Sequence, residues 1–120
     1  MAASTNSILG TVRKMIGADS YFDSDLIVHI NTVFSKLNQL GVGPEEGFEI
    51  EDESTEWSDY ISDNISVLNM VKSYMELQVK LLFDISTASS YLIDEWNKKS
   101  EEYEWRLNAA VDFKKETKEE

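Results

Sequence analysis

The chain has 120 residues, enough for one domain with a buried core but too few for a second. Its 11 basic and 23 acidic residues give a net charge of −12, which argues against a protein that recognises DNA or RNA sequences, because such proteins neutralise phosphates with Lys and Arg. The same charge suits a surface that DNA passes without sticking.

The absence of cysteine excludes a disulfide framework and a thiolate metal site. No apolar run approaches the roughly 18 residues of a membrane span, and the first ten residues lack the features of a signal peptide. We therefore expect a soluble protein, intracellular when made, that does not engage a membrane.

Two amphipathic helices are predicted in the first 40 residues. Polar residues at positions 4–6 can cap a short helix that Gly17 ends. Asp23 or Ser24 can cap a second helix that ends at Gly41. Its apolar residues recur with the i, i+3, i+4, i+7 spacing of a single helix face: Leu26, Ile27, Ile30, Val33, Phe34, Leu37 and Leu40.

Residues 41–56 are predicted to form an acidic loop, since three glycines, the only proline and seven acidic residues deny them a regular helix. Apolar and polar residues alternate over 48–51, which allows a short extended piece or hairpin edge. Ser54 or Thr55 can cap a helix of one or two turns around Trp57. The acidic run lacks the ligand spacing of a calcium-binding loop, so we interpret it as solvated.

The segment 67–82 predicts a central helix, capped by Asp63 or Asn64, that is apolar over most of its circumference. Two apolar rows run along it, namely Val67, Met70, Tyr74, Leu77, Leu81 and Leu68, Val71, Met75, Val79, Leu82. Such a helix needs packing partners on two sides. Some of these partners could come from other chains.

A last helix is predicted from about Ala88 to Asp112, with Thr87 as its cap. Its stripe steps by three and four residues through Ile93, Trp96, Ser100, Tyr103, Leu107 and Ala110. At about 1.5 Å per residue the helix would be near 37 Å long, so part of it should project or meet another subunit. The fold class is therefore all-α, a small helical bundle with a long C-terminal helical hairpin and one acidic loop. Residues 1–112 would be the domain and 113–120 a flexible charged tail.

The candidate functional residues point to protein contact and not to catalysis. The single histidine, His29, has no Cys, second His or nucleophile motif beside it, so we expect no enzyme, no metal site and no cofactor. Trp105 is rotated by about 200° from Tyr103 and falls on a charged helix face, where it is either an anchor for a partner or covered by another part of its own chain. Arg106 could pair with an acidic partner there. The partner-binding candidates are Trp96, Tyr103, Trp105, Arg106 and Phe113.

Three segments of the chain resemble the head-tail connector (adaptor) proteins of long-tailed bacteriophages. They are ILGTVRKMIGADSYFDSDLIVHINTVFSKLNQLGVG, STEWSDYI and VKSYMELQVKLLFDISTASSYLIDEWNKKSEEYEWRLN. The resemblance implies a homo-oligomeric ring of about twelve copies in the neck of the virion, assembled in the host cytoplasm. The ring would bind the portal protein on one side and the head-closure or stopper protein on the other, with DNA passing through unbound. In that family the C-terminal segment, here residues 103–120, commonly reaches the portal.

Two other functions stay open at this point. An acidic helical module could mimic DNA and block a basic protein, in which case binding should collapse with salt. A small enzyme with an unfamiliar site would require loss of activity to map to His29 or to the acidic loop.

Overall fold

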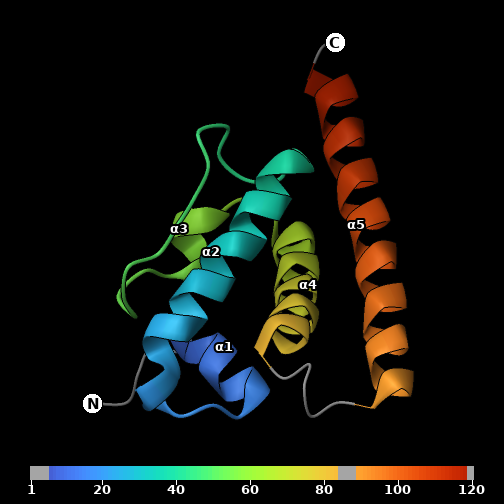
Figure 1. Cartoon of the computed structure of the whole chain (residues 1–120). Helices are drawn as coiled ribbons and strands as arrows, with labels where there is room; N and C mark the ends of the chain where they lie inside the picture. Colours follow the sequence, from blue (N-terminus) through green and yellow to red (C-terminus); the bar gives the residue numbers. More distant parts are fainter. Residues whose placement is uncertain (1–5, 84–88, 119–120) are drawn as a thin grey trace.

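The structure, a computed structural model, describes residues 6–83 and 89–118, with the backbone alone from residue 112 onward. It confirms the all-α fold class, since no strand occurs within these two ranges (Figure 1). The molecule is flat, with extents of 48 × 39 × 21 Å. Its elements in chain order are α1 (Ile8–Ile16), the 3-10 turn η1 (Ser20–Phe22), α2 (Asp23–Gln39), α3 (Trp57–Tyr60), α4 (Ile65–Phe83) and α5 (Ser90–Lys118).

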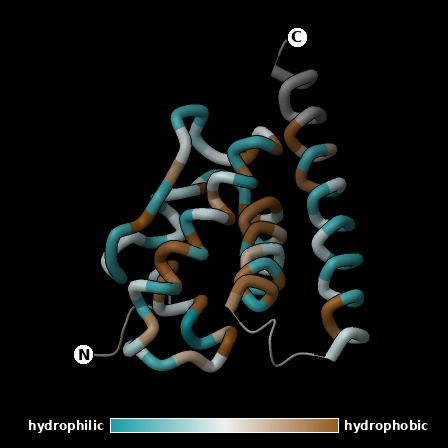
Figure 2. The backbone as a smooth tube through the Cα atoms, viewed as in Figure 1, coloured by the Kyte–Doolittle hydropathy of each residue, from teal (hydrophilic) through white to brown (hydrophobic). Residues whose placement is uncertain are grey.

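The central helix of the fold is α4, which packs against α1 and α2 on one side and against α5 on the other. Figure 2 shows more hydrophobic residues along it than along α5, which is hydrophilic along much of its length. Its middle is fully covered at Val71, Tyr74, Met75 and Val79. The two-sided packing predicted for this helix is thus met largely within one chain. Exposed apolar groups remain near its ends, at Ile65 and Leu82.

The N-terminal helices begin at different residues from those expected. Ser7, and not a residue at 4–6, caps α1 by accepting a hydrogen bond from the Gly10 N–H at 3.1 Å. Gly17 ends α1 in the left-handed conformation, as predicted, with φ of 69°. No side chain caps α2, because η1 runs directly into it and the turn supplies the preceding carbonyls. The carboxylate of Asp23, an expected cap, instead binds Arg13.

The acidic loop lies over α2 and returns through α3 (Figure 1). Its alternating segment pairs with a side-chain amide instead of a strand: the Ile50 N–H donates to Asn31 Oδ1 at 2.8 Å, and Asn31 Nδ2 donates to the Ile50 carbonyl at 3.1 Å. Glu56 is the N-cap of α3, where Ser54 or Thr55 was expected, because its N–H can donate a hydrogen bond to Asp59 Oδ2 at 2.8 Å.

Helix α5 runs antiparallel to α4 and forms the expected C-terminal hairpin with it (Figure 1). Ser89 caps it, accepting from the Leu92 N–H at 3.2 Å; the predicted cap, Thr87, lies outside the described residues. The helix continues to Lys118 and not only to Asp112, and its C-terminal end extends past the bundle. The expected boundary at residue 112 therefore falls inside a helix, and the division into domain and tail stays a prediction.

Candidate protein-interaction surfaces

The outer face of α5 carries two exposed aromatic side chains. Trp105 is 73% exposed and Tyr91 is 70% exposed. They lie there because the opposite face of the helix is occupied: Ser100 and Leu107 are buried against the bundle. No part of the described chain covers Trp105, which leaves a large apolar group free for another molecule.

Arg106 follows Trp105 on the same exposed side of α5. Its guanidinium forms an ion pair with Glu102 one turn earlier, at 2.7 Å. Both side chains are more than half exposed, so this pair contributes little to stability and costs little to exchange for another carboxylate. An apolar anchor beside a replaceable cation is suited to a surface that is apolar and acidic.

The remaining predicted residues do not join Trp105 and Arg106 in one patch. Trp96 is half-buried on the α4 side, with the Lys80 ammonium 5.8 Å from the centroid of its ring. Tyr103 packs against the core. Phe113 lies in α5 on the face of Arg106, by helical spacing, and its side chain is outside the described residues. The structure thus separates the five candidates into an outward pair, an inward pair and a residue of the projecting helix end.

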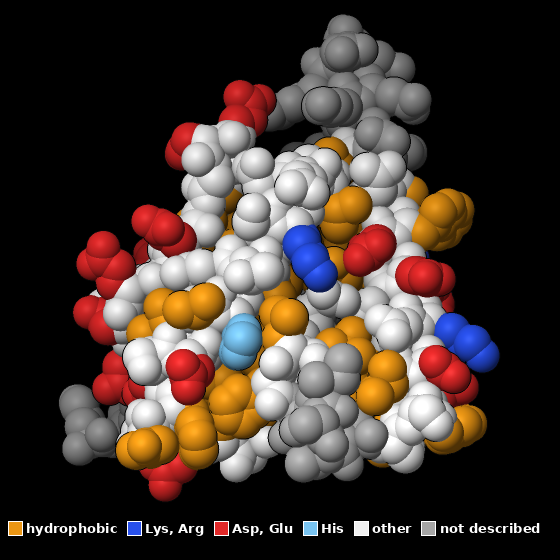
Figure 3. Space-filling view, viewed as in Figure 1, with side chains coloured by type: hydrophobic (Ala, Val, Ile, Leu, Met, Phe, Trp, Pro, Cys, Tyr) orange, Lys and Arg blue, Asp and Glu red, His pale blue; other side chains and the backbone are white. Residues whose placement is uncertain are grey.

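A second exposed apolar patch was not predicted from the sequence. The rings of Tyr21 and Phe22 are 5.1 Å apart, and Phe22 also meets Phe83 at 5.3 Å. His29 completes the patch, 6.3 Å from Phe83. Figure 3 shows the hydrophobic side chains that gather on this face. The signal in the sequence was the adjacent Tyr-Phe pair between two helices, which belongs to neither amphipathic stripe.

A groove opens where the loop after α2, the segment after α3 and the end of α5 meet. Its volume is about 560 Å³. Half of its lining residues have apolar or aromatic side chains, namely Val42, Tyr60, Ile61, Val67, Ala110 and Val111, and the others are glycines or polar residues. Two carboxylates, Glu45 and Asp63, stand at its edge. The groove therefore combines apolar side chains with negative charge.

Charge is distributed unevenly over the molecule. The stretch 45–63 has no basic residue and contains Glu45, Glu46, Glu49, Glu51, Asp52, Glu53, Glu56, Asp59 and Asp63. Figure 3 shows acidic side chains along the side of the molecule that the loop occupies. This side repels polyanions and attracts basic groups.

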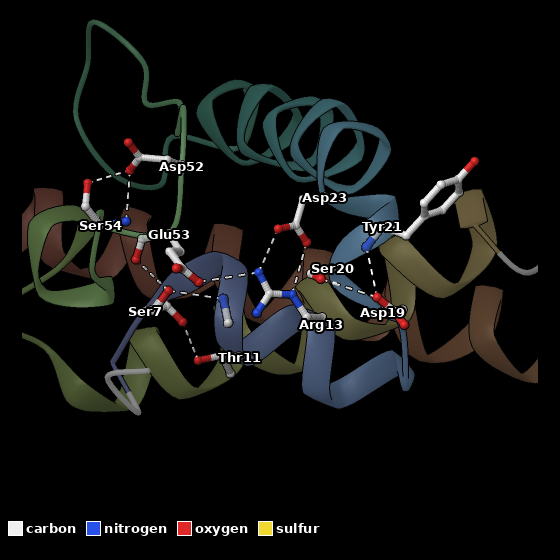
Figure 4. Close-up of polar contacts among 11 residues, drawn as sticks. Ser7, Thr11, Arg13, Asp19, Ser20, Tyr21, Asp23, Asp52, Glu53 and Ser54 are labelled. Carbon is white, nitrogen blue, oxygen red and sulfur yellow. Dashed lines mark hydrogen bonds and ion pairs between the residues drawn. The ribbon is translucent and has the colours of Figure 1, made fainter. Parts of the chain in front are cut away.

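The acidic loop is held in place by α1 (Figure 4). Arg13 donates to both carboxylate oxygens of Asp23, at 3.0 and 2.8 Å, and its Nη2 also reaches Glu53 Oε2 at 3.4 Å. Ser7 Oγ donates to the Glu53 carbonyl at 2.8 Å, and the indole of the buried Trp57 donates to Thr11 Oγ1 at 3.2 Å. The loop is thus anchored at its C-terminal half within a single copy.

The described residues contain no group of three or more His, Asp or Glu side chains placed to hold a metal ion. Within the same part of the chain, no helix has both the length and the hydropathy needed to cross a bilayer. The features that remain are surfaces: an aromatic and basic pair on α5, an apolar patch near the ends of α2 and α4, and a groove with an acidic edge.

Comparison with known proteins gave one match. A family model described as phage connector protein matches residues 8–114, which is nearly the whole chain. Neither a curated protein nor a solved structure matches it.

Proposed function

Because the chain belongs to the phage connector protein family, we propose that it is a head-tail connector (adaptor) that forms a homo-oligomeric ring between the portal and the head-closure or stopper protein. It would act as a structural protein of the virion neck, without catalysis. About twelve copies would surround a channel through which the DNA passes.

The exposure of Trp105 is the observation that supports this proposal most directly. A tryptophan left 73% exposed has its apolar surface available for another protein. The projecting end of α5, beyond residue 111, places additional chain outside the bundle and within reach of a neighbour. These two features support a protein whose role is to be joined to other proteins.

The net charge supports the placement around DNA. Carboxylates repel the phosphate backbone, so an acidic molecule lining or flanking a channel would let DNA move without binding it. Association with portal would then depend on apolar burial, at about 25 cal/mol per Å² before the costs of association.

Binding to the portal protein encoded by the same genome tests the proposal. The purified chain should co-sediment with assembled portal and should remain bound at about 0.5 M salt, where surface electrostatics are screened. Failure to bind portal under assembly conditions would contradict the proposal. Binding to unrelated basic proteins that disappears as salt is raised would instead favour the DNA-mimic function.

A further inference from the structure

The groove between the loop after α2 and the end of α5 is not filled by any side chain among the described residues. Apolar and aromatic side chains in its lining are open to solvent, an arrangement that favours burial by another group. Gly41 and Gly43 allow the loop to approach closely here, because a Cβ on Gly41 would lie 3.2 Å from Val111 Cγ1 and one on Gly43 would lie 2.5 Å from Tyr60 Cε1. The groove is thus built by close backbone packing.

The charge at the groove selects its occupant. Glu45 and Asp63 stand at its edge, and both belong to the stretch 45–63, which contains no Lys or Arg. An anionic group would be repelled. The fitting occupant is a bulky apolar side chain next to a cation, since the first would cover the apolar side chains of the lining and the second would pair with a carboxylate there.

The chain itself displays such a pair, in Trp105 and Arg106. From Trp105 to Ala110, which lines the groove, the helix rises by about 7 Å and turns by about 140°. Trp105 and Ala110 therefore lie more than one turn apart along α5 and on different faces of it, whereas Arg106, four residues before Ala110, lies nearer the groove. Trp105 points away from the groove of its own copy, so only the groove of another copy is available to it.

We propose that Trp105 and Arg106 of one copy bind the groove of the next copy. Trp105 would cover the apolar side chains of the groove, and Arg106 would exchange its exposed partner Glu102 for Glu45 of the neighbour. The two surfaces differ, so the contact is head-to-tail and leaves one free surface of each kind on every pair. Such a contact forms a closed ring when the rotation between neighbouring copies divides a full turn.

This inference rests on the proposed function, in which the chain assembles with copies of itself. A cross-linking experiment tests it, made simple by the absence of cysteine. The double variant Ser62→Cys/Ala109→Cys places one thiol at the groove and one on the exposed turn after Trp105, and it keeps Trp105 and Arg106. A short bis-maleimide reagent should join these variants into a ladder that extends beyond the dimer.

Adding Trp105→Ala to the double variant should reduce cross-linking at least tenfold. Adding Lys99→Glu should not, although Lys99 lies one heptad before Arg106 on the same exposed side. A control pair, Ser62→Cys/Ser35→Cys, places the second thiol on the exposed surface of α2 and should give no ladder. Cross-linking that is absent, that stops at dimers or that is unaffected by Trp105→Ala would overturn the inference.

Imaging of the wild-type chain mixed with portal separates this inference from the proposed function. The double variant is cross-linked in a parallel mixture with portal. If rings form on portal but the cross-linked double variant gives no ladder, the Trp105–groove contact is overturned and the connector function is left intact. No ring and no portal binding would overturn both.

Discussion

The hydroxyl of Tyr74 in α4 donates a hydrogen bond of 2.7 Å to Glu104 Oε2 in α5. Tyr74 is fully buried, so this bond fixes the rotation of α5 against the central helix. Glu104 immediately precedes Trp105, and successive residues of a helix are about 100° apart. By holding Glu104 toward α4, Tyr74 keeps Trp105 on the outer face.

Burial raises the pKa of Tyr74, and the hydrogen bond to Glu104 raises it further. In the unfolded chain a tyrosine titrates at about pH 10, so the folded chain keeps this proton to higher pH. The contribution is fully present below about pH 10, and the free energy of unfolding falls by up to about 1.4 kcal/mol per pH unit above it. Burial also raises the pKa of Tyr60.

Between about pH 10 and 11, the free energy of unfolding of Tyr74→Phe should fall with pH about half as steeply as that of the wild type, because one of the two buried hydroxyls is removed. Urea unfolding at a series of pH values measures this. Tyr91→Phe is the matched control, since Tyr91 is exposed on α5 and should leave the profile unchanged. An unaltered slope in Tyr74→Phe would show that its proton is not linked to folding.

The two faces of α5 predict opposite effects of alanine substitution two residues apart. Leu107 is fully buried, so Leu107→Ala should lower the free energy of unfolding by about 2–5 kcal/mol. Trp105→Ala should change it by less than about 0.5 kcal/mol, because the side chain is exposed, while it weakens portal binding or self-association at least tenfold. Chemical denaturation and co-sedimentation of the same two variants provide the measurements. A Trp105→Ala variant as unstable as Leu107→Ala would mean that the indole is packed within its own chain.

Alanine substitutions at two glycines of the acidic loop should distinguish the effect of backbone strain from that of side-chain collision. Gly43 and Gly47 have φ of 84° and 94°, so alanine is strained at both, by about 1–2 kcal/mol. At Gly43 the new Cβ would also collide with the ring of Tyr60, whereas at Gly47 it meets nothing within 4 Å. Gly43→Ala should therefore destabilise the protein more than Gly47→Ala in thermal or urea unfolding. Equal losses would indicate that the loop moves away from Tyr60 at little cost.

The pattern of apolar residues was enough to predict the fold class, the antiparallel hairpin and the outward direction of Trp105, because helical periodicity states which side of a helix is buried. It did not predict the first residues of the helices. At the start of α2, Asp23 is a good cap by type, but Arg13 binds its carboxylate, and Arg13 belongs to another helix. Contacts between helices thus determine which residue caps a helix, and these contacts cannot be read from the local sequence.

The candidate site was predicted only in part for a related reason. Spacing along α5 identified Trp105 correctly as the residue off the stripe. The groove, however, is made by residues from the loop, from the segment after α3 and from α5, which are up to 70 positions apart in sequence. No single-helix pattern contains such a feature. The same holds for the Tyr21–Phe22–Phe83 patch, which joins η1 to the end of α4.

Substitution of Arg13 should have a local effect on the acidic loop and not a global effect on the fold. Its guanidinium reaches both oxygens of Asp23, and also Glu53, with a fork that a lysine ammonium cannot reproduce. Arg13→Lys should therefore cost about 1 kcal/mol and release the C-terminal half of the acidic loop. Hydrogen exchange should accelerate at the amides that tie this half to α1, the Ile8 N–H bound to the Thr55 carbonyl and the Trp57 N–H bound to the Asn6 carbonyl. Lys14→Arg, at an exposed position of the same helix, is the control. If these amides exchange at the wild-type rate in Arg13→Lys, then the contacts of Trp57 and Ser7 hold the loop without the ion pair.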